Sequence, residues 1–430
     1  MNGQSISVYF QIIDRLSVVV AIRDANITEN RIKQGASRMR IFVTLLLTLS
    51  FLIGTTSASS GQIRVKRLDG STISSTEIES AVARLMKAAR VTGIAVAIIN
   101  DSKVAYVKSF GFGNKEEQKP LTEQTIMYGA SFTKAVFAYL VMQLVEESVI
   151  DLDKPVYKYL EKPLPEYEKY KDLAGDDRYK LITARMLLAH TSGFPNWRWI
   201  NKDEKLDIKF TPGAKYSYSG EGINLLQFVI EITTGKSVGQ MIEERIFKPF
   251  AMTRTNMTWE DRFEDNYAIG YDEQEKPLGH RKRTAARAAG SMDTTISDYA
   301  KFIQAVMQGR GLKPQTKELM LTPQIQILSK HQFPTPSNET TDENRKVQLA
   351  YGLGWGLLNT PHGKAYFKEG HDDGWGNYGI CFPDKKIAVV LMSNSSNGES
   401  IFKELLDILI KDNYTPWKWE NYIPYNTKSR

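Results

Sequence analysis

The chain has 430 residues, of which 42% are hydrophobic and 24% charged, and it is long enough for one large domain or two medium ones. No stretch has the biased composition of a disordered chain, so the protein is globular. The net charge of +7 is mild, and the densest basic cluster (Arg281, Lys282, Arg283 and Arg287) is too short to indicate nucleic-acid binding. Such a charge suits an anionic cell envelope or an acidic substrate.

Cysteine and histidine are too sparse for a metal site. Cys381 is the single cysteine, which excludes an intramolecular disulfide and a Cys/His zinc site. The five histidines show neither HxxxH nor HxH spacing. We therefore expect neither a metal nor a cofactor.

A short apolar run near the N-terminus predicts export. Residues 41–54 read IFVTLLLTLSFLIG, follow an Arg-Met-Arg triplet and precede TTSASS, which is the order of a secretory signal. The run is short for a membrane span. We expect a translation start at Met39, cleavage after Ala58 and a periplasmic or secreted protein, with residues 1–58 as extension and signal peptide. An uncleaved anchor or a buried strand is the alternative.

Helical and strand patterns then follow in a recognisable order. Residues 76–89 have helical spacing, and Thr76 with Glu79 fits a capping box. Strand patterns occur at both ends of the mature chain and helical patterns in the middle. The predicted strands are 92–100, 103–113, 351–358 and 378–394 (with a turn at 383–386), and the further helices are 131–149, 217–234, 297–307 (N-cap Ser297) and 400–411.

This order predicts an α+β fold: an antiparallel sheet built from both chain ends and flanked by helices. We expect one domain over residues 59–430, with a mainly helical insert at about 130–286.

The residues Ser131-Phe132-Thr133-Lys134 form an S-x-x-K motif at the start of a predicted helix. Three residues are nearly one helical turn, so the hydroxyl and the amine share a face. A serine needs a base to become a nucleophile, and a lysine with a lowered pKa can be that base. A second S-x-x-K begins at Ser400, where we expect the serine to be only the N-cap of the last helix.

The context of Ser131 resembles the serine β-lactamase-related family, which includes class C β-lactamases, D-alanyl-D-alanine peptidases and esterases. Five segments resemble the family in its order, over roughly residues 90–395. They are PLTEQTIMYGASFTKAVFAYLVMQLVEESVIDLDKPVYKYL, ITARMLLAHTSGFPNW, FTPGAKYSYSGEGINLLQFVIE, AAGSMDTTISDYAKF and GHDDGWGNYGICFPDKKIAVVLMSN. The resemblance implies a β-lactamase/transpeptidase-like fold and acyl transfer to a serine.

By this resemblance, three elements would form the active site. The first is Ser131 with Lys134. The second is a Tyr-x-Asn that maps to Tyr218-Ser219-Gly220, with Tyr218 shuttling the proton. The third is a Lys/His-x-Gly strand that maps to His371-Asp372-Asp373, followed by Gly374. The N–H groups of Ser131 and Gly374 would form the oxyanion hole.

Two residues depart from the family pattern. Gly220 stands where lactam- and peptide-hydrolysing members have an asparagine that contacts the substrate amide, which weakens the case for β-lactam hydrolysis. Asp373 stands where glycine is usual, and its charge could repel a substrate carboxylate. His371 in place of lysine is common in esterase-like members.

Each of these residues also has a structural alternative. Tyr218 could be a core aromatic, and His371 a polar residue at a strand start. We expect His190 to hydrogen-bond a loop rather than to catalyse. Trp197 and Trp199 fit either loop packing or a substrate cleft.

We therefore expect an exported serine hydrolase acting on an ester, peptide or lactam carbonyl, with an esterase or D-amino-acid peptidase favoured. The alternatives are a β-lactamase and a non-catalytic penicillin-binding-like envelope protein. The expected partner is a small-molecule or peptidoglycan-like substrate, together with association with the cell envelope.

Overall fold

An interior strand of the main sheet, β3 (Gly93–Asn100), has no exposed residue. The computed structural model describes residues 62–427, and all eight residues of β3 are buried in it. Its side chains alternate between two hydrophobic clusters: Ala95 and Ala97 pack in one, Val96 and Ile98 in the other. Because successive strand residues point to opposite faces, the sheet is covered on both sides.

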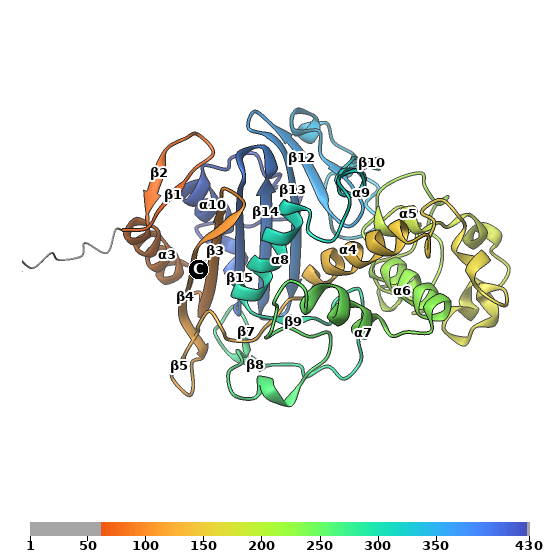
Figure 1. The fold of residues 1–430 in the computed structure, drawn as a ribbon, viewed down its shortest axis with the longest axis horizontal. Helices are drawn as coiled ribbons and strands as arrows, with labels where there is room; N and C mark the ends of the chain where they lie inside the picture. The colour runs from red at the N-terminus through yellow and green to blue at the C-terminus, as the bar shows by residue number, and fades with distance from the viewer. Residues whose placement is uncertain (1–61, 428–430) are drawn as a thin grey trace, which may run out of the picture. The chain divides into compact units, whose positions relative to one another are not determined.

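The main sheet of the described residues is nine-stranded and antiparallel (Figure 1). Its strands come from both ends of this region, which confirms the predicted α+β architecture. In spatial order they are β10 (Ile325–Gln326), β11 (Ala350–Tyr351), β12 (Gly356–Thr360), β13 (Gly363–Asp372), β14 (Trp375–Phe382), β15 (Ile387–Ser393), β3, β4 (Lys103–Asn114) and β5 (Lys119–Pro120). Three two-stranded pairs accompany it: β1 (Arg64–Lys66) with β2 (Thr72–Ser74), β6 (Met127–Tyr128) with β9 (Asp293–Thr294), and β7 (Gly270–Tyr271) with β8 (Pro277–Gly279).

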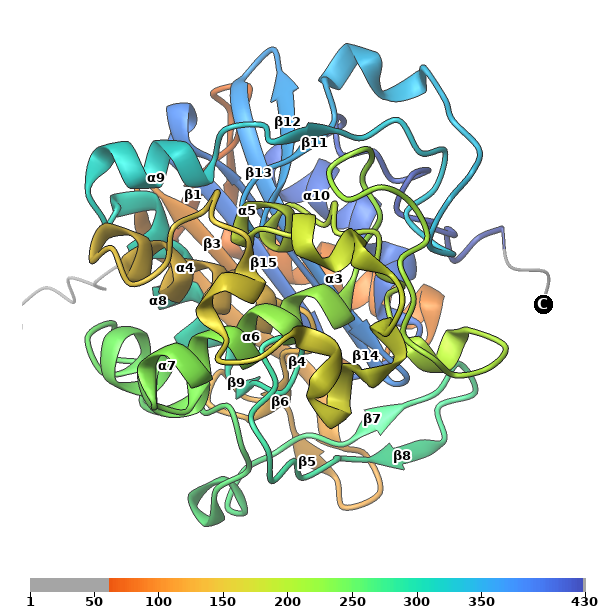
Figure 2. The same cartoon turned by 90° about the vertical axis from the view of Figure 1, so that its right-hand side faces the viewer.

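Helices cover the two faces of the sheet. α8 (Ile296–Gln308) packs on β3, β4 and β15, whereas α3 (Ser75–Ala89) and α10 (Phe402–Ile410) pack against one another on the other hydrophobic cluster. Beside the sheet lie α4 (Phe132–Glu146), α5 (Ala184–Leu188) and α6 (Gly220–Thr234), on the side that faces the viewer in Figure 2. The remaining helices are α7 (Val238–Ile242) and α9 (Pro314–Met320).

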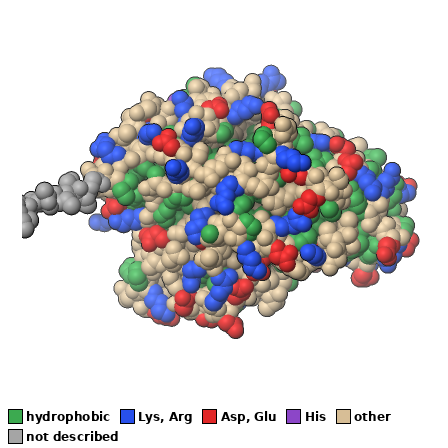
Figure 3. Space-filling model, in the orientation of Figure 1, with side chains coloured by type: hydrophobic (Ala, Val, Ile, Leu, Met, Phe, Trp, Pro, Cys, Tyr) green, Lys and Arg blue, Asp and Glu red, His purple; other side chains and the backbone are tan. Residues whose placement is uncertain are grey.

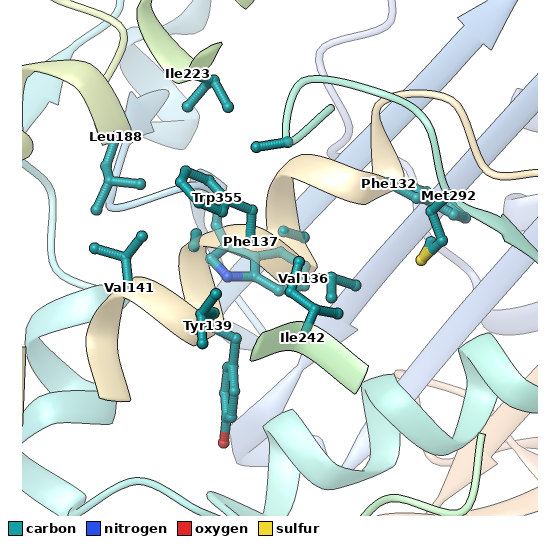
Figure 4. Packing of buried hydrophobic residues seen from close by; sticks show 14 of the residues in the cluster. Phe132, Val136, Phe137, Tyr139, Val141, Leu188, Ile223, Ile242, Met292 and Trp355 are labelled. Carbon is teal, nitrogen blue, oxygen red and sulfur yellow. The ribbon is translucent and has the colours of Figure 1, made fainter. Parts of the chain in front are cut away.

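α4 is buried almost along its whole length. Every residue from Phe132 to Leu144 is buried, and a helix that is buried all round belongs to the core. Figure 4 shows its side chains among those of Leu188, Ile223, Ile242 and Trp355. This packing fixes the position of the helix start, at Ser131.

Three predicted N-caps are wrong by one or two residues. α3 begins one residue before the expected helix, because Ser74 and Glu77 form the capping box: the Glu77 carboxylate accepts the Ser74 N–H at 2.8 Å. Thr295, not Ser297, caps α8. Ser400 lies in a 3₁₀ turn, and its Oγ donates to the Asn397 carbonyl oxygen at 2.6 Å.

Residues from Ile63 onward form one compact unit. The predictions for residues 1–58 lie outside the described residues. Within residues 62–427, no helix has the length and apolar character needed to cross a membrane. Basic and acidic side chains are interspersed over the face drawn in Figure 3.

Candidate active site

Ser131 stands at the end of a tight turn that leads into α4. The preceding residue, Ala130, has a φ of 45°, a left-handed conformation that costs a non-glycine residue about 1 kcal/mol or more. The Thr133 hydroxyl holds this turn: it donates to the Ala130 carbonyl oxygen at 2.6 Å and accepts the Met292 N–H at 3.1 Å. The strained turn therefore presents Ser131 at the N-terminus of a rigid helix.

Lys134 lies one turn into α4, and its amine is buried against Ser131. Its Nζ is 2.9 Å from Ser131 Oγ and donates to the Ala289 carbonyl oxygen at 2.5 Å. Burial and the positive charge of Lys368 hold the pKa of Lys134 well below its usual value, although Glu369 opposes the shift. A neutral amine at this position can accept the serine proton.

Tyr218 joins the pair from the segment before α6. Its side chain is 2% exposed, and its ring centroid lies 4.9 Å from the Nζ of Lys134. Burial raises the pKa of the Tyr218 hydroxyl well above 10, and a hydrogen bond with Ser131 opposes the rise. The structure thus brings together Ser131, Lys134 and Tyr218, the first two elements predicted.

Lys368, in β13, is a site residue that the sequence analysis missed. Its Nζ donates to the Tyr218 hydroxyl at 3.2 Å and to the Glu369 carboxylate at 2.8 Å, and both charged side chains are buried. Burial lowers the pKa of Lys368, and Glu369 limits this shift. Lys368-Glu369-Gly370 is itself a Lys-x-Gly motif, and it begins three residues before His371, where the predicted third element starts.

Gly370 lets β13 pass close to Ser131. A Cβ on Gly370 would lie 2.9 Å from the Gly129 carbonyl oxygen and 3.0 Å from the Ser131 nitrogen. Only glycine fits so near a neighbouring backbone.

Beyond Phe367, β13 stays paired with β14 on one edge, but β12 no longer lies along its other edge. The Gly352 N–H donates to the Trp355 carbonyl oxygen at 2.8 Å. In an antiparallel sheet, successive residues point their backbone groups alternately to the two neighbouring strands. Counting from this bond through the pairs of β11 with β12 and of β12 with β13 therefore gives the direction of each N–H in β13. By that alternation, the N–H groups of Phe367, Glu369 and His371 point toward the β12 side. β12 begins opposite Phe367, so the His371 N–H points past the end of that strand.

The predicted third element reaches the site in part: His371 and Asp372 lie on the cavity wall, whereas Lys368 and Gly370 are the residues next to Tyr218 and Ser131. The His371 ring pairs through Nδ1 with Glu399 at 2.9 Å; its side chain is 39% exposed. Burial favours the neutral ring, but the Glu399 charge outweighs it and raises the pKa of His371. The Gly374 N–H donates to Ser396 Oγ at 2.9 Å, so Gly374 departs from the prediction: its N–H is taken by a side chain of the protein. Asp372 lies at the cavity, and Asp373 is exposed.

Trp197 occupies the space that a side chain at position 220 would need. A Cβ on Gly220 would lie 2.4 Å from the indole ring of Trp197. Asn196 accepts the Gly220 N–H at 2.9 Å, which anchors this loop to the start of α6. Trp197 also stacks on Trp199, with ring centroids 4.8 Å apart.

His190 hydrogen-bonds a loop, as expected, and Cys381 lies in the core. His190 is buried, and its Nδ1 accepts the Ser219 N–H at 3.2 Å. Burial holds the pKa of His190 well below its usual value. Cys381 is buried, and burial raises the pKa of its thiol to about 12, which keeps it protonated.

A cavity of about 430 Å³ opens beside Ser131. Its lining combines Ser131, the two tryptophans and several basic residues: Tyr128, Ala130, Ser131, Lys134, Asn196, Trp197, Trp199, Tyr218, Arg281, Lys282, Arg283, Thr284, Ala285, Arg287, Ala289, Gly290, Phe333, His371 and Asp372. The part of the chain that the structure describes holds no cluster of three His, Cys, Asp or Glu side chains suited to a metal ion.

A protein-family model described as "Beta-lactamase" matches residues 78–410, more than half of the chain. Penicillin-binding protein 4* of Bacillus subtilis (strain 168) is 26% identical over 328 residues, which cover 68% of this chain and 65% of that protein. Unguisins hydrolase ungD of Aspergillus violaceofuscus (strain CBS 115571) is 23% identical over 358 residues, which cover 74% of this chain and 61% of that protein. The chain therefore spans less than two thirds of the length of these two relatives.

Among solved structures, the octameric penicillin-binding protein homologue from Pyrococcus abyssi is similar with a TM-score of 0.64. The match covers 80% of each chain at 24% sequence identity. At this identity the likeness concerns the fold alone.

Proposed function

This chain belongs to the β-lactamase family, and from that premise we propose that it hydrolyses esters or D-peptides through an acyl-enzyme on Ser131. The observation that carries the proposal is the 2.9 Å distance between the Lys134 Nζ and the Ser131 Oγ. A buried amine with a lowered pKa, within hydrogen-bond reach of a serine at a helix start, is the arrangement that activates a nucleophile.

In the first step, Ser131 Oγ attacks the substrate carbonyl carbon while Lys134 Nζ takes the hydroxyl proton. The N–H groups of Ser131 and His371 stabilise the negative charge that develops on the carbonyl oxygen. The direction of the His371 N–H in β13 supports this assignment, which replaces Gly374.

The attack forms a tetrahedral intermediate. Its collapse expels the alcohol or amine, which receives a proton through Tyr218 and Lys134. Water then attacks the acyl carbonyl carbon, its proton passes through Lys134 and Tyr218 to Ser131 Oγ, and the C–Oγ bond breaks to release the carboxylic acid and free Ser131. Lys368-Glu369-Gly370 acts as the third element of the site: Lys368 hydrogen-bonds Tyr218, and Gly370 lets the strand approach Ser131.

The position of Trp197 favours an ester over a β-lactam substrate. Its indole fills the space that an asparagine at position 220 would use to reach a substrate amide. A β-lactamase remains the second candidate, because Lys368 supplies a buried lysine next to Tyr218. Both candidates are consistent with an exported, envelope-associated protein with its signal peptide at residues 39–58, and N-terminal sequencing of the native protein tests that placement.

The substrate class is tested by comparing turnover of a p-nitrophenyl ester, a D-alanyl-D-alanine peptide and nitrocefin. The ester or the peptide should be hydrolysed well above the Ser131→Ala background. Ser400→Ala is the matched control, because Ser400 begins the other S-x-x-K motif and its hydroxyl donates to the Asn397 carbonyl oxygen of its own turn. Nitrocefin turnover above background, with no ester or peptide turnover, would favour the β-lactamase instead.

A further inference from the structure

Three arginines line the cavity beside Ser131: Arg281, Arg283 and Arg287, here called the arginine strip. The segment that carries these arginines is anchored to the site by Ala289 and Gly290, which follow it in the chain. The Ala289 carbonyl oxygen accepts from Lys134 at 2.5 Å, and the Gly290 carbonyl oxygen accepts from the Tyr128 hydroxyl at 2.8 Å. The arginine strip is therefore continuous with the catalytic residues.

Arg283 is held in place by its contacts. Its guanidinium carbon lies 3.4 Å from the centroid of the Tyr128 ring, and its side chain is only 13% exposed. It also donates to the Arg281 carbonyl oxygen at 3.0 Å, while its own carbonyl oxygen accepts the Trp259 N–H at 2.7 Å. A guanidinium stacked on an aromatic ring keeps its hydrogen-bond donors in one plane and ready for a planar anion.

The charge of the arginine strip is barely balanced inside the protein. Asp372, the one acidic residue on the described cavity wall, lies 3.8 Å from Arg283. Within residues 62–427, neither Arg281 nor Arg287 forms an ion pair. Lys282 differs, because its amine contacts both oxygens of the Glu264 carboxylate, at 2.6 and 2.7 Å.

We propose that the arginine strip binds a carboxylate of the substrate, carried several bonds from the carbonyl that Ser131 attacks. The preferred substrates are then acidic esters or amides. Guanidinium groups bind carboxylates in pairs of parallel hydrogen bonds, and three of them around one cavity exceed what Asp372 can neutralise. This inference rests on the proposed function, since it names the substrate class of the same site.

The test uses a matched pair of esters: mono-p-nitrophenyl glutarate, which has a free carboxylate, and its neutral methyl ester. The wild-type protein should hydrolyse the acid with the higher kcat/KM. Arg283→Gln and Arg287→Gln should each lower that value about tenfold, mainly through KM, with little change for the neutral ester. Lys282→Gln is the matched control and should leave the preference unchanged, because Glu264 already neutralises Lys282.

Equal kcat/KM for the two esters, or an equal loss on both in the arginine variants, would overturn the proposal while leaving the serine mechanism standing. If the wild-type protein turns over neither ester, the result counts against the proposed function instead. In that case calorimetric binding of the two esters to Ser131→Ala decides: tighter binding of the acid supports the arginine strip, and equal binding contradicts it. Arg287 is exposed, so Arg287→Gln serves even if Arg283→Gln disturbs the packing on Tyr128.

Discussion

The Nζ of Lys368 lies 3.2 Å from the hydroxyl oxygen of Tyr218, and both side chains are buried. This contact joins β13 to the segment before α6, beside the Ser131–Lys134 pair. It places the positive charge of Lys368 near Lys134, where burial and this charge together keep the pKa of the Lys134 amine low.

Lys368→Met should therefore shift the pH profile of acylation. In the proposed mechanism Lys134 acts as a base only when neutral, so the rate should rise as pH rises through its lowered pKa. Without Lys368 that pKa increases, and the acidic limb of kcat/KM should move to higher pH, with a fall in rate of about 100-fold. If the acidic limb of Lys368→Met stays at the wild-type pH, Lys368 does not influence the pKa of Lys134.

The same substitution leaves Glu369 buried without its cation, so we expect a loss of about 3 kcal/mol in the free energy of unfolding. The pH profile is measured well below the unfolding temperature for this reason. Lys282→Met is the control, since Lys282 lines the cavity but pairs with Glu264.

In the proposed mechanism the Tyr218 hydroxyl relays protons, so Tyr218→Phe should lower kcat about 100-fold or more. The ring and its packing remain, so the unfolding temperature should change little. Tyr216→Phe is the matched control: Tyr216 is buried two residues away and packs on Tyr351. Equal loss in both variants would indicate a packing effect rather than proton transfer.

Gly220→Asn should destabilise the protein by about 2 kcal/mol, because the new Cβ meets the indole of Trp197 at 2.4 Å. In a Trp197→Ala background the same substitution should cost much less. Urea unfolding of the two single variants and the double variant measures this coupling. If the losses of stability in the two single variants add up in the double variant, Trp197 does not occupy the space beside position 220.

The His371–Glu399 pair should make stability depend on pH. The pKa of His371 is raised in the folded protein, so its contribution is complete below the unfolded value of about 6.5 and is lost as pH rises through the folded pKa. Glu399→Gln should therefore reduce the free energy of unfolding more at about pH 5 than at about pH 9. An equal loss of unfolding free energy at both pH values would contradict the pairing of His371 with Glu399.

Much of the fold followed from local patterns. The unbroken apolar run of β3, the pattern of β4 and the apolar character of α4 predicted these elements to within a few residues. The S-x-x-K spacing also sufficed to predict that Ser131 and Lys134 meet, because three residues on a helix set that geometry by themselves.

The third element could not be assigned in the same way. Lys368-x-Gly370 and His371-x-Asp373 lie in or beside one hairpin, and only packing against α4 decides which stands beside Ser131. The lack of a side chain at Gly370 is what allows that approach. The space taken by Trp197 next to Gly220 is likewise a contact between separate loops, which no local pattern contains.

The central claim is that Ser131 is the nucleophile, and intact-mass spectrometry after incubation with a fluorophosphonate tests it most directly. The wild-type protein and Ser400→Ala should each gain the mass of one adduct, and Ser131→Ala should gain none. A folded wild-type protein that gains no mass, or a Ser131→Ala variant that gains as much as wild type, would contradict the account, and the former would favour a non-catalytic binding protein.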